Sequence, residues 1–156
     1  MARLVGPALT SFHFSLVLVS PLKRARETCT LAVPAEQAQL RPDMMEWDYG
    51  AYEGRTTADI HLERPDWNLW RDGAPGGETA AMVGERTDRV IAEARAGGGD
   101  IALFAHGHLL RVLTARWLDL QPQDGRLFAL DTATVSLLGY ERDQAVIRSW
   151  NLPARQ

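Results

Sequence analysis

The sequence predicts a three-layer α/β domain, in which helices cover both faces of a mostly parallel sheet. Short, continuously apolar runs have the length and composition of strands buried on both faces. Stretches with helical periodicity alternate with these runs along the chain. At 156 residues the chain suits one domain, which buries roughly 68–70% of the surface of its unfolded state.

The first strand and the first long helix are expected to follow each other directly. The run LVLVS at Leu16–Ser20 predicts a buried parallel strand. Pro21 is a common signal at the start of a helix, and it precedes a predicted helix over Arg24–Ala32.

A second helix, strand and helix are expected in the middle of the chain. Met82–Ala96 has the apolar stripe of a helix, and Gly97–Gly99 ends the pattern. The run IALFA at Ile101–Ala105 predicts a second buried parallel strand. Leu109–Leu118 is apolar nearly all round, which predicts a buried helix. The stripe of the first helix consists of Val83, Thr87, Val90, Ile91 and Ala94.

The end of the chain predicts a hairpin. Thr134–Tyr140 and Ala145–Asn151 are strand-like, and the polar residues Glu141–Gln144 between them are a connection of hairpin length. We therefore expect this pair of strands to be antiparallel.

The segment Arg41–Thr79 differs from the rest. It is rich in proline and glycine and holds three of the five tryptophans. We expect an excursion over one end of the sheet, with a short helix near Thr56–His61, that covers an active site as a binding loop or lid. The alternative is a passive surface insertion.

Composition excludes several classes of protein. The formal net charge of -3 is not the electrostatic footprint of a nucleic-acid-binding protein. No apolar run reaches the ~18 residues of a membrane-spanning helix, and Ala2–Leu9 lacks the apolar core of a signal peptide. The single cysteine, Cys29, cannot form an internal disulfide, so a reducing cytoplasm is the expected location.

Candidate site residues cluster where the two buried strands end. The first strand runs into a segment with Arg24 and Arg26, and the second runs into His106 and His108. Ligands of open α/β sheets bind at the carboxyl ends of strands, and helix N-termini there attract anions. Arginine forks suit phosphate oxygens. The sequence therefore predicts a site for phosphate or another oxyanion.

Other interpretations of these residues stay open. An arginine in a first helical turn is usually a solvated surface residue, and a histidine after a strand is usually a satisfied polar residue. His106 and His108 could mark a metal, although Cys29, His13 and His61 lack metal-ligand spacing. Aromatic neighbours make three acids candidates for proton transfer. These acids are Glu46, Asp48 and Glu53.

Four motifs in order resemble the histidine phosphatase superfamily, in its phosphoglycerate-mutase-like branch. They are SPLKRARET at residues 20–28, EWDYGAYEG at 46–54, GGET at 76–79 and AHGH at 105–108. The match is strongest to small bacterial broad-specificity phosphatases. It implies hydrolysis of small phosphate monoesters through a phosphohistidine, without metal or other cofactor. Phosphoryl transfer depends mostly on positioning and electrostatics.

The resemblance also implies roles for individual residues. Arg24 matches an arginine that clamps phosphate, and His106 matches the second histidine, which binds the transferring phosphoryl group. Glu46 matches the proton donor for the leaving group. Gly107 and His108 lie beside the phosphate. Substrate contacts are implied for Trp47, Asp48, Tyr49 and His108.

One expected motif does not occur. The family opens with a strand that ends in Arg-His-Gly, whose histidine is the nucleophile, and these 156 residues contain no Arg-His-Gly. We therefore expect residues 1–156 to form one domain that is incomplete at its N-terminus, with the first strand missing and a neighbouring strand edge unpaired. Met1–Leu9 resembles the helix that follows that strand.

Two other functions stay open. A non-catalytic relative would keep the phosphate clamp without the nucleophile. A phosphoglycerate mutase is a weaker alternative, because Gly54–Gly76 is short for a mutase. The expected partner is a small phosphorylated substrate or inorganic phosphate, with neither nucleic acid nor membrane, and a homo-oligomer is left open.

Overall fold

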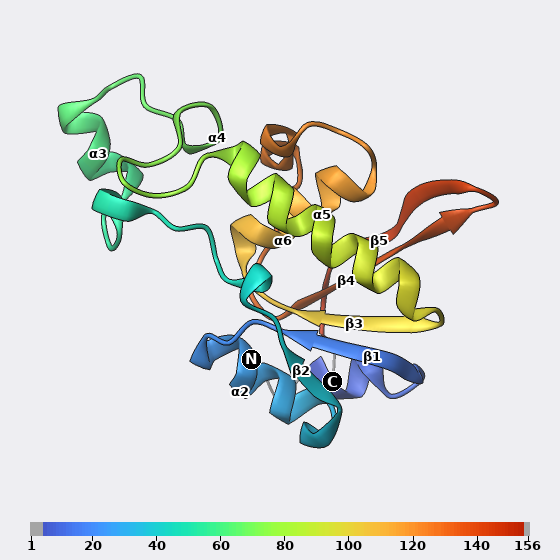
Figure 1. The fold of residues 1–156 in the computed structure, drawn as a ribbon. Helices are drawn as coiled ribbons and strands as arrows, with labels where there is room; N and C mark the ends of the chain where they lie inside the picture. The colour runs from blue at the N-terminus through green and yellow to red at the C-terminus, as the bar shows by residue number, and fades with distance from the viewer. Residues whose placement is uncertain (1–4, 155–156) are drawn as a thin grey trace.

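The computed structural model describes residues 5–154 and has the three layers that the sequence predicts (Figure 1). Its main sheet consists of β1 (Phe14–Val19), β2 (Ala38–Leu40) and β3 (Asp100–Phe104). All pairs in this sheet are parallel, and the order is β2-β1-β3. The predicted mostly parallel α/β fold is confirmed.

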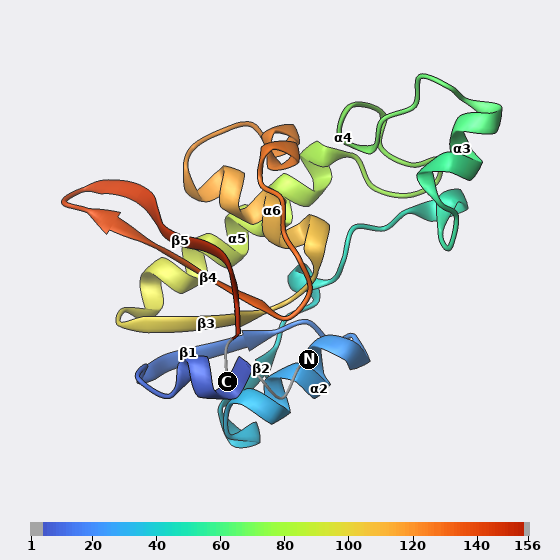
Figure 2. The same cartoon turned by 180° about the vertical axis from the view of Figure 1, so that it is seen from behind.

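Alternate side chains of β1 enter two different cores, one on each face of the sheet. Val17 and Val19 pack with α1 (Val5–Leu9) and α2 (Lys23–Ala32). Leu18 packs on the opposite face, with α5 (Ala80–Gly97) and α6 (Gly107–Trp117). Figures 1 and 2 show these two helical layers on either side of the sheet. A strand buried on both faces explains the unbroken apolar run that predicted β1.

The long helices agree with their predictions. Helix α5 buries the stripe expected for it except for the half-buried Ala94, and Gly98 caps its end with a φ of 63°. Helix α6 buries Leu109 and Val112 among its core residues. The predicted helix near residues 56–61 is α3 (Thr57–Glu63), which begins with a capping box between Thr56 and Asp59.

A separate two-stranded sheet ends the chain. Strands β4 (Thr134–Glu141) and β5 (Gln144–Pro153) are antiparallel, as predicted. Within residues 5–154, β3 pairs only with β1 and β4 only with β5, so each has one edge without a hydrogen-bonded neighbour. The predicted parallel strand IALFA is therefore an edge strand of this sheet. Its Ala102 and Phe104 are nevertheless buried.

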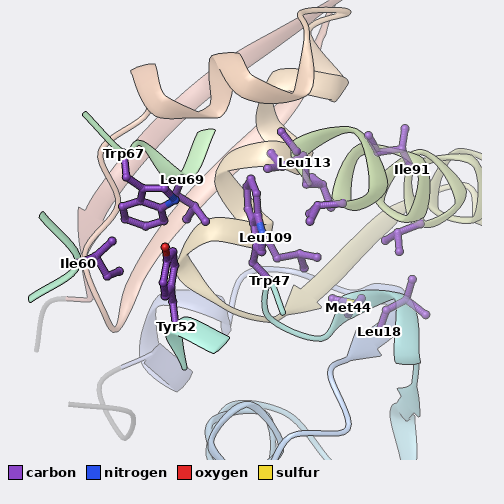
Figure 3. Close-up of a cluster of buried hydrophobic side chains, with 14 residues drawn as sticks. Leu18, Met44, Trp47, Tyr52, Ile60, Trp67, Leu69, Ile91, Leu109 and Leu113 are labelled. Atoms are coloured by element: carbon purple, nitrogen blue, oxygen red, sulfur yellow. The ribbon is translucent and has the colours of Figure 1, made fainter. Parts of the chain in front are cut away.

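The segment 41–79 is mostly loops with short helical turns, and much of it is anchored in the core. Besides α3 it contains η3 (Pro42–Met44), η4 (Gly50–Tyr52) and α4 (Leu69–Asp72). Trp47, Tyr52 and Trp67 belong to the same hydrophobic cluster as Leu109 of α6 (Figure 3). The described residues also form the 3-10 turns η2 (Ala35–Gln37) and η5 (Pro122–Leu127). None of the helices described has the length and hydropathy to cross a bilayer.

Candidate functional site

The ends of the two predicted buried strands, where the candidate site residues follow, lie side by side at one end of the main sheet. Val19 and Phe104 are register partners in the parallel strands β1 and β3, so the residues that follow them are neighbours. The Ser20 amide continues this pairing by donating to the Phe104 carbonyl at 2.9 Å. Because both strands end here, residues 86 positions apart in sequence come into contact.

His106 lies buried between Ser20 and Arg24. Its Nε2 is 2.8 Å from the Ser20 hydroxyl, and Arg24 Nε donates to its Nδ1 at 3.0 Å. Burial, and then the neighbouring positive charge of Arg24, lower the pKa of His106 from its ordinary value. Arg24 itself is exposed, so its guanidinium reaches into the site from the solvent side.

Glu46 caps the N-terminus of α6. Its Oε1 accepts hydrogen bonds from the amides of Trp47 at 2.9 Å and Leu109 at 3.0 Å. Its Oε2 accepts one longer bond, 3.3 Å, from the His108 amide. The carboxyl oxygens supply acceptors there because the first amides of a helix have no partner within the helix.

This cap partly corrects the expectation that the helix N-terminus would be open to an anion. Of the first-turn amides of α6, those of His108 and Leu109 are used by Glu46. In the described part of the chain, the Gly107 amide has no hydrogen-bond acceptor. The loop that holds Glu46 therefore satisfies two amides of this helix end.

A largely buried ion pair holds the loop that carries Glu46. Arg86 of α5 donates to both carboxylate oxygens of Glu78, at 2.8 and 2.9 Å. Its remaining donors reach the backbone carbonyls of Asp43, Met45 and Glu46 at 2.8, 2.6 and 3.2 Å. All five guanidinium N–H groups are thus used.

Glu78 holds the same loop from the other side. Its Oε2 accepts from the Asp48 amide at 2.9 Å, and its own amide donates to the Asp48 carbonyl at 2.9 Å. Its carbonyl accepts from the indole of Trp47 at 2.9 Å. The position of Glu46 therefore depends on α5 and on the GGET motif together.

His108 lies among aromatic rings. The Tyr49 hydroxyl is 2.6 Å from its Nδ1, and the Trp70 and Trp47 rings lie 5.4 and 6.3 Å from it, centroid to centroid. Burial lowers the pKa of His108 and raises the pKa of Tyr49. Both groups are therefore neutral, and one hydrogen bond joins the phenol to the imidazole.

The structure brings Arg24, Glu46, His106 and Gly107 together around the start of α6. Other predicted residues have structural partners of their own. Trp47 is 1% exposed in the core, and Asp48 Oδ1 accepts from the Gly50 amide at 2.8 Å to shape its turn. His106 and His108 turn to different partners, so their imidazoles do not converge on one metal position.

Sequence reasoning missed Ser20, Glu78 and Arg86 as site residues. Ser20 and Glu78 lie inside the motifs SPLKRARET and GGET, so the motifs offered a signal for them. Arg86 had none, because an arginine in the middle of a helix is usually solvated. It is 8% exposed here.

The fold and this site together define an α/β phosphatase-like protein with an arginine–histidine pair at the ends of two parallel strands. The model of the histidine phosphatase superfamily (branch 1) matches residues 1–153, and the chain belongs to this family. The predicted resemblance is confirmed, and it places the chain among hydrolases of phosphate esters.

Several known proteins are similar to the chain. An acid phosphatase of Mycobacterium tuberculosis is 35% identical over 144 residues, which are 90% of this chain and 70% of that protein. Sedoheptulose 1,7-bisphosphatase of Saccharomyces cerevisiae is 36% identical over 137 residues, and the match spans 71% of this chain but only 50% of the yeast enzyme.

Solved structures agree with this assignment. The structure of an open reading frame of Mycobacterium tuberculosis superposes with a TM-score of 0.91 at 33% identity, covering 99% of this chain and 81% of that one. A mycobacterial glucosyl-3-phosphoglycerate phosphatase in complex with inorganic phosphate has a TM-score of 0.83 at 26% identity, covering 98% of this chain and 84% of the other.

Proposed function

We propose that this domain hydrolyses small phosphate monoesters through a phosphohistidine intermediate. The observation that carries the proposal is the contact between Arg24 and His106 at the shared end of β1 and β3. The Arg24 guanidinium and the Nδ1 side of His106 meet there beside the Gly107 amide at the start of a helix, an arrangement that suits the oxygens of a phosphoryl group. Segment 41–79 covers this end of the sheet and shapes the space for the rest of the substrate.

Glu46 is proposed as the proton donor to the leaving group. Its Oε1 holds two amides, whereas Oε2 has only the longer bond to the His108 amide. Oε2 is therefore the oxygen that carries the proton. The ester P–O bond breaks as the phosphoryl group passes to a histidine nitrogen, and the alcohol takes the proton of Glu46. Water then breaks the P–N bond, phosphate leaves, and the carboxylate regains a proton.

The nucleophilic histidine is proposed to lie on a strand outside these residues. No Arg-His-Gly occurs in the sequence, and the histidines present lie outside such a motif. The unpaired edge of β3 supports the proposal, because a parallel strand added there would end beside His106. The same lack of a nucleophile favours a second candidate, a non-catalytic domain that binds a small phosphorylated ligand or inorganic phosphate.

Adding the proposed strand that ends in Arg-His-Gly distinguishes the phosphatase from the non-catalytic phosphate-binding domain. We expect the 156-residue chain alone to show no turnover of a panel of small phosphate esters, since binding without an in-line nucleophile is not catalysis. The chain extended by an apolar strand ending in Arg-His-Gly, encoded upstream in frame, should hydrolyse them. If the unextended monomer turns over these esters and His106→Ala abolishes the turnover, the nucleophile lies within residues 1–156 and the proposal is wrong.

The role of Glu46 is tested in the extended, active form. Glu46→Gln should slow esters with poor leaving groups strongly, by about 10²–10⁴-fold, and nitrophenyl phosphate much less. A good leaving group needs little protonation, which explains the difference. Equal losses for both kinds of ester would remove Glu46 from this role.

A further inference from the structure

The partners of His106 require one particular tautomer. Arg24 Nε donates to Nδ1 at 3.0 Å, and a guanidinium cannot accept a hydrogen bond. Nδ1 therefore presents its lone pair, and the proton of the neutral ring lies on Nε2. Nε2 is 2.8 Å from Ser20 Oγ, which accepts this N–H.

Ser20 is suited to hold the inward-facing nitrogen. Its side chain is fully buried at 0% exposure, and its Oγ also accepts from the Leu22 amide at 3.3 Å. A hydroxyl has two acceptor lone pairs, so it can receive both hydrogen bonds. The opposite side of the ring, at Nδ1, faces the exposed Arg24 and is the side that a ligand can reach.

An oxyanion bound beside Arg24 requires Nδ1 to donate a hydrogen bond, whereas Arg24 requires Nδ1 to accept one. Sulfate and the dianion of a phosphate monoester offer acceptors only, so Nδ1 can bind either of them only as an N–H donor. Nε2 already carries the proton that Ser20 accepts. While Ser20 accepts the Nε2 proton, His106 can donate to the anion only after Nδ1 gains a second proton.

We propose that Ser20 is a positioning residue that keeps the proton of His106 on Nε2, and that oxyanion binding beside Arg24 is coupled to the uptake of one proton at Nδ1. This inference rests on the proposed function, because it takes Arg24 and His106 as the anion-binding pair. The proton comes from solvent and adds to the lone pair of Nδ1. Only the hydrogen bond between Arg24 and His106 is lost.

The surroundings of His106 determine the sign of the coupling. Arg24 from α2 and Arg86 from α5 oppose a charged ring, Glu46 from the adjacent loop favours it, and burial opposes it most strongly. The pKa of His106 in the free protein is therefore low, and an anion at Nδ1 raises it. Between the free and bound values the affinity should fall by up to about tenfold for each unit of rising pH.

Sulfate is the appropriate probe because it stays a dianion over this range of pH, so any proton must come from solvent. The complete chain, labelled with ¹⁵N-histidine, is titrated with sulfate at about pH 6, 7 and 8, and imidazole nitrogen shifts report the tautomer and charge of each ring. We expect Nε2–H alone in the free protein, both nitrogens protonated in the complex, and weaker binding as the pH rises.

Variants then assign the effect to Ser20. Ser20→Ala should weaken sulfate binding about tenfold at pH 7, because the imidazolium loses the acceptor of its buried N–H. Thr114→Ala is the matched control, since it removes a buried hydroxyl of α6 that donates to the Leu110 carbonyl at 2.8 Å. It should change neither the tautomer nor the affinity. If Ser20→Ala does not fold, the spectra of the unaltered chain still decide the tautomer and the proton uptake.

The outcomes separate this inference from the proposed function. Sulfate binding with the same affinity at every pH, or a free protein with its proton on Nδ1, overturns the coupling and leaves the oxyanion site standing. Failure of both sulfate and inorganic phosphate to bind at any pH overturns the oxyanion site and the coupling together. Equal affinities for Ser20→Ala and the unaltered chain would remove Ser20 from its role.

Discussion

Replacing Arg86 with methionine should destabilise the domain by about 3–5 kcal/mol, the usual cost of removing one partner of a buried ion pair. The side chains of Arg86 and Glu78 are only 10% and 17% exposed. The substitution leaves the Glu78 carboxylate with the Asp48 amide as its remaining partner. It also removes a donor from three carbonyls of the 43–46 loop. Methionine keeps most of the volume, so the loss is chiefly polar.

Arg89→Met provides a matched control on the same helix. Arg89 pairs with Asp43 at a distance of 2.7 Å, but these side chains are 60% and 37% exposed. Exposed pairs contribute about 0.2–1 kcal/mol, because water screens the charges and ordering long side chains costs entropy. The two variants remove the same chemical group from the same helix and differ mainly in burial.

Urea unfolding of the two variants and the parent measures the difference directly. We expect the midpoint of Arg86→Met to fall far below that of Arg89→Met, with thermal midpoints separated by roughly 10 °C. Amide exchange of His108 and Leu109 should also quicken in Arg86→Met alone, since their acceptor Glu46 lies on the loosened loop. Arg86→Met no more costly than Arg89→Met would refute the argument that burial makes this pair essential.

Three further predictions concern the loop, the pH dependence and the sheet edges. Gly77→Ala should lower the free energy of unfolding by more than about 2 kcal/mol, because its Cβ would lie 2.2 Å from the Asp48 carbonyl oxygen. The control Gly54→Ala, with φ +75° and no neighbour within 4 Å, should lower it only by the ~1–2 kcal/mol of the left-handed backbone. Thermal melting measures both losses. The free energy of unfolding should fall as the pH drops from about 7 to 5, because burial lowers the folded-state pKa of His106 and the unfolded chain takes up protons first. In urea titrations His106→Asn should flatten this dependence on pH, and an unchanged slope would contradict the prediction. The chain as given should self-associate through the free edges of β3 and β4, so sedimentation as a single monomer at all concentrations would count against it.

Local patterns in the sequence were sufficient for the main elements. An unbroken apolar run such as LVLVS reports burial on both faces, and the stripe on α5 reports the face that a helix buries; both are properties of neighbouring residues. The hairpin of β4 and β5 follows from a short polar connection in the same way. Strand β2 was missed because its three residues, Ala38–Leu40, are too few to form a pattern.

Patterns among neighbouring residues were enough to predict the layered α/β fold, its long helices and the motifs that identify the family. Which polar groups contact one another became visible only in the folded chain. Ser20 and His106 are 86 positions apart, and Arg86 reaches the Glu46 carbonyl across 40 positions. Hydrophobic periodicity records which side of an element is buried, but it carries no information on the partner of a donor. That partner is set by the end-to-end alignment of parallel strands and by the loop folded across them.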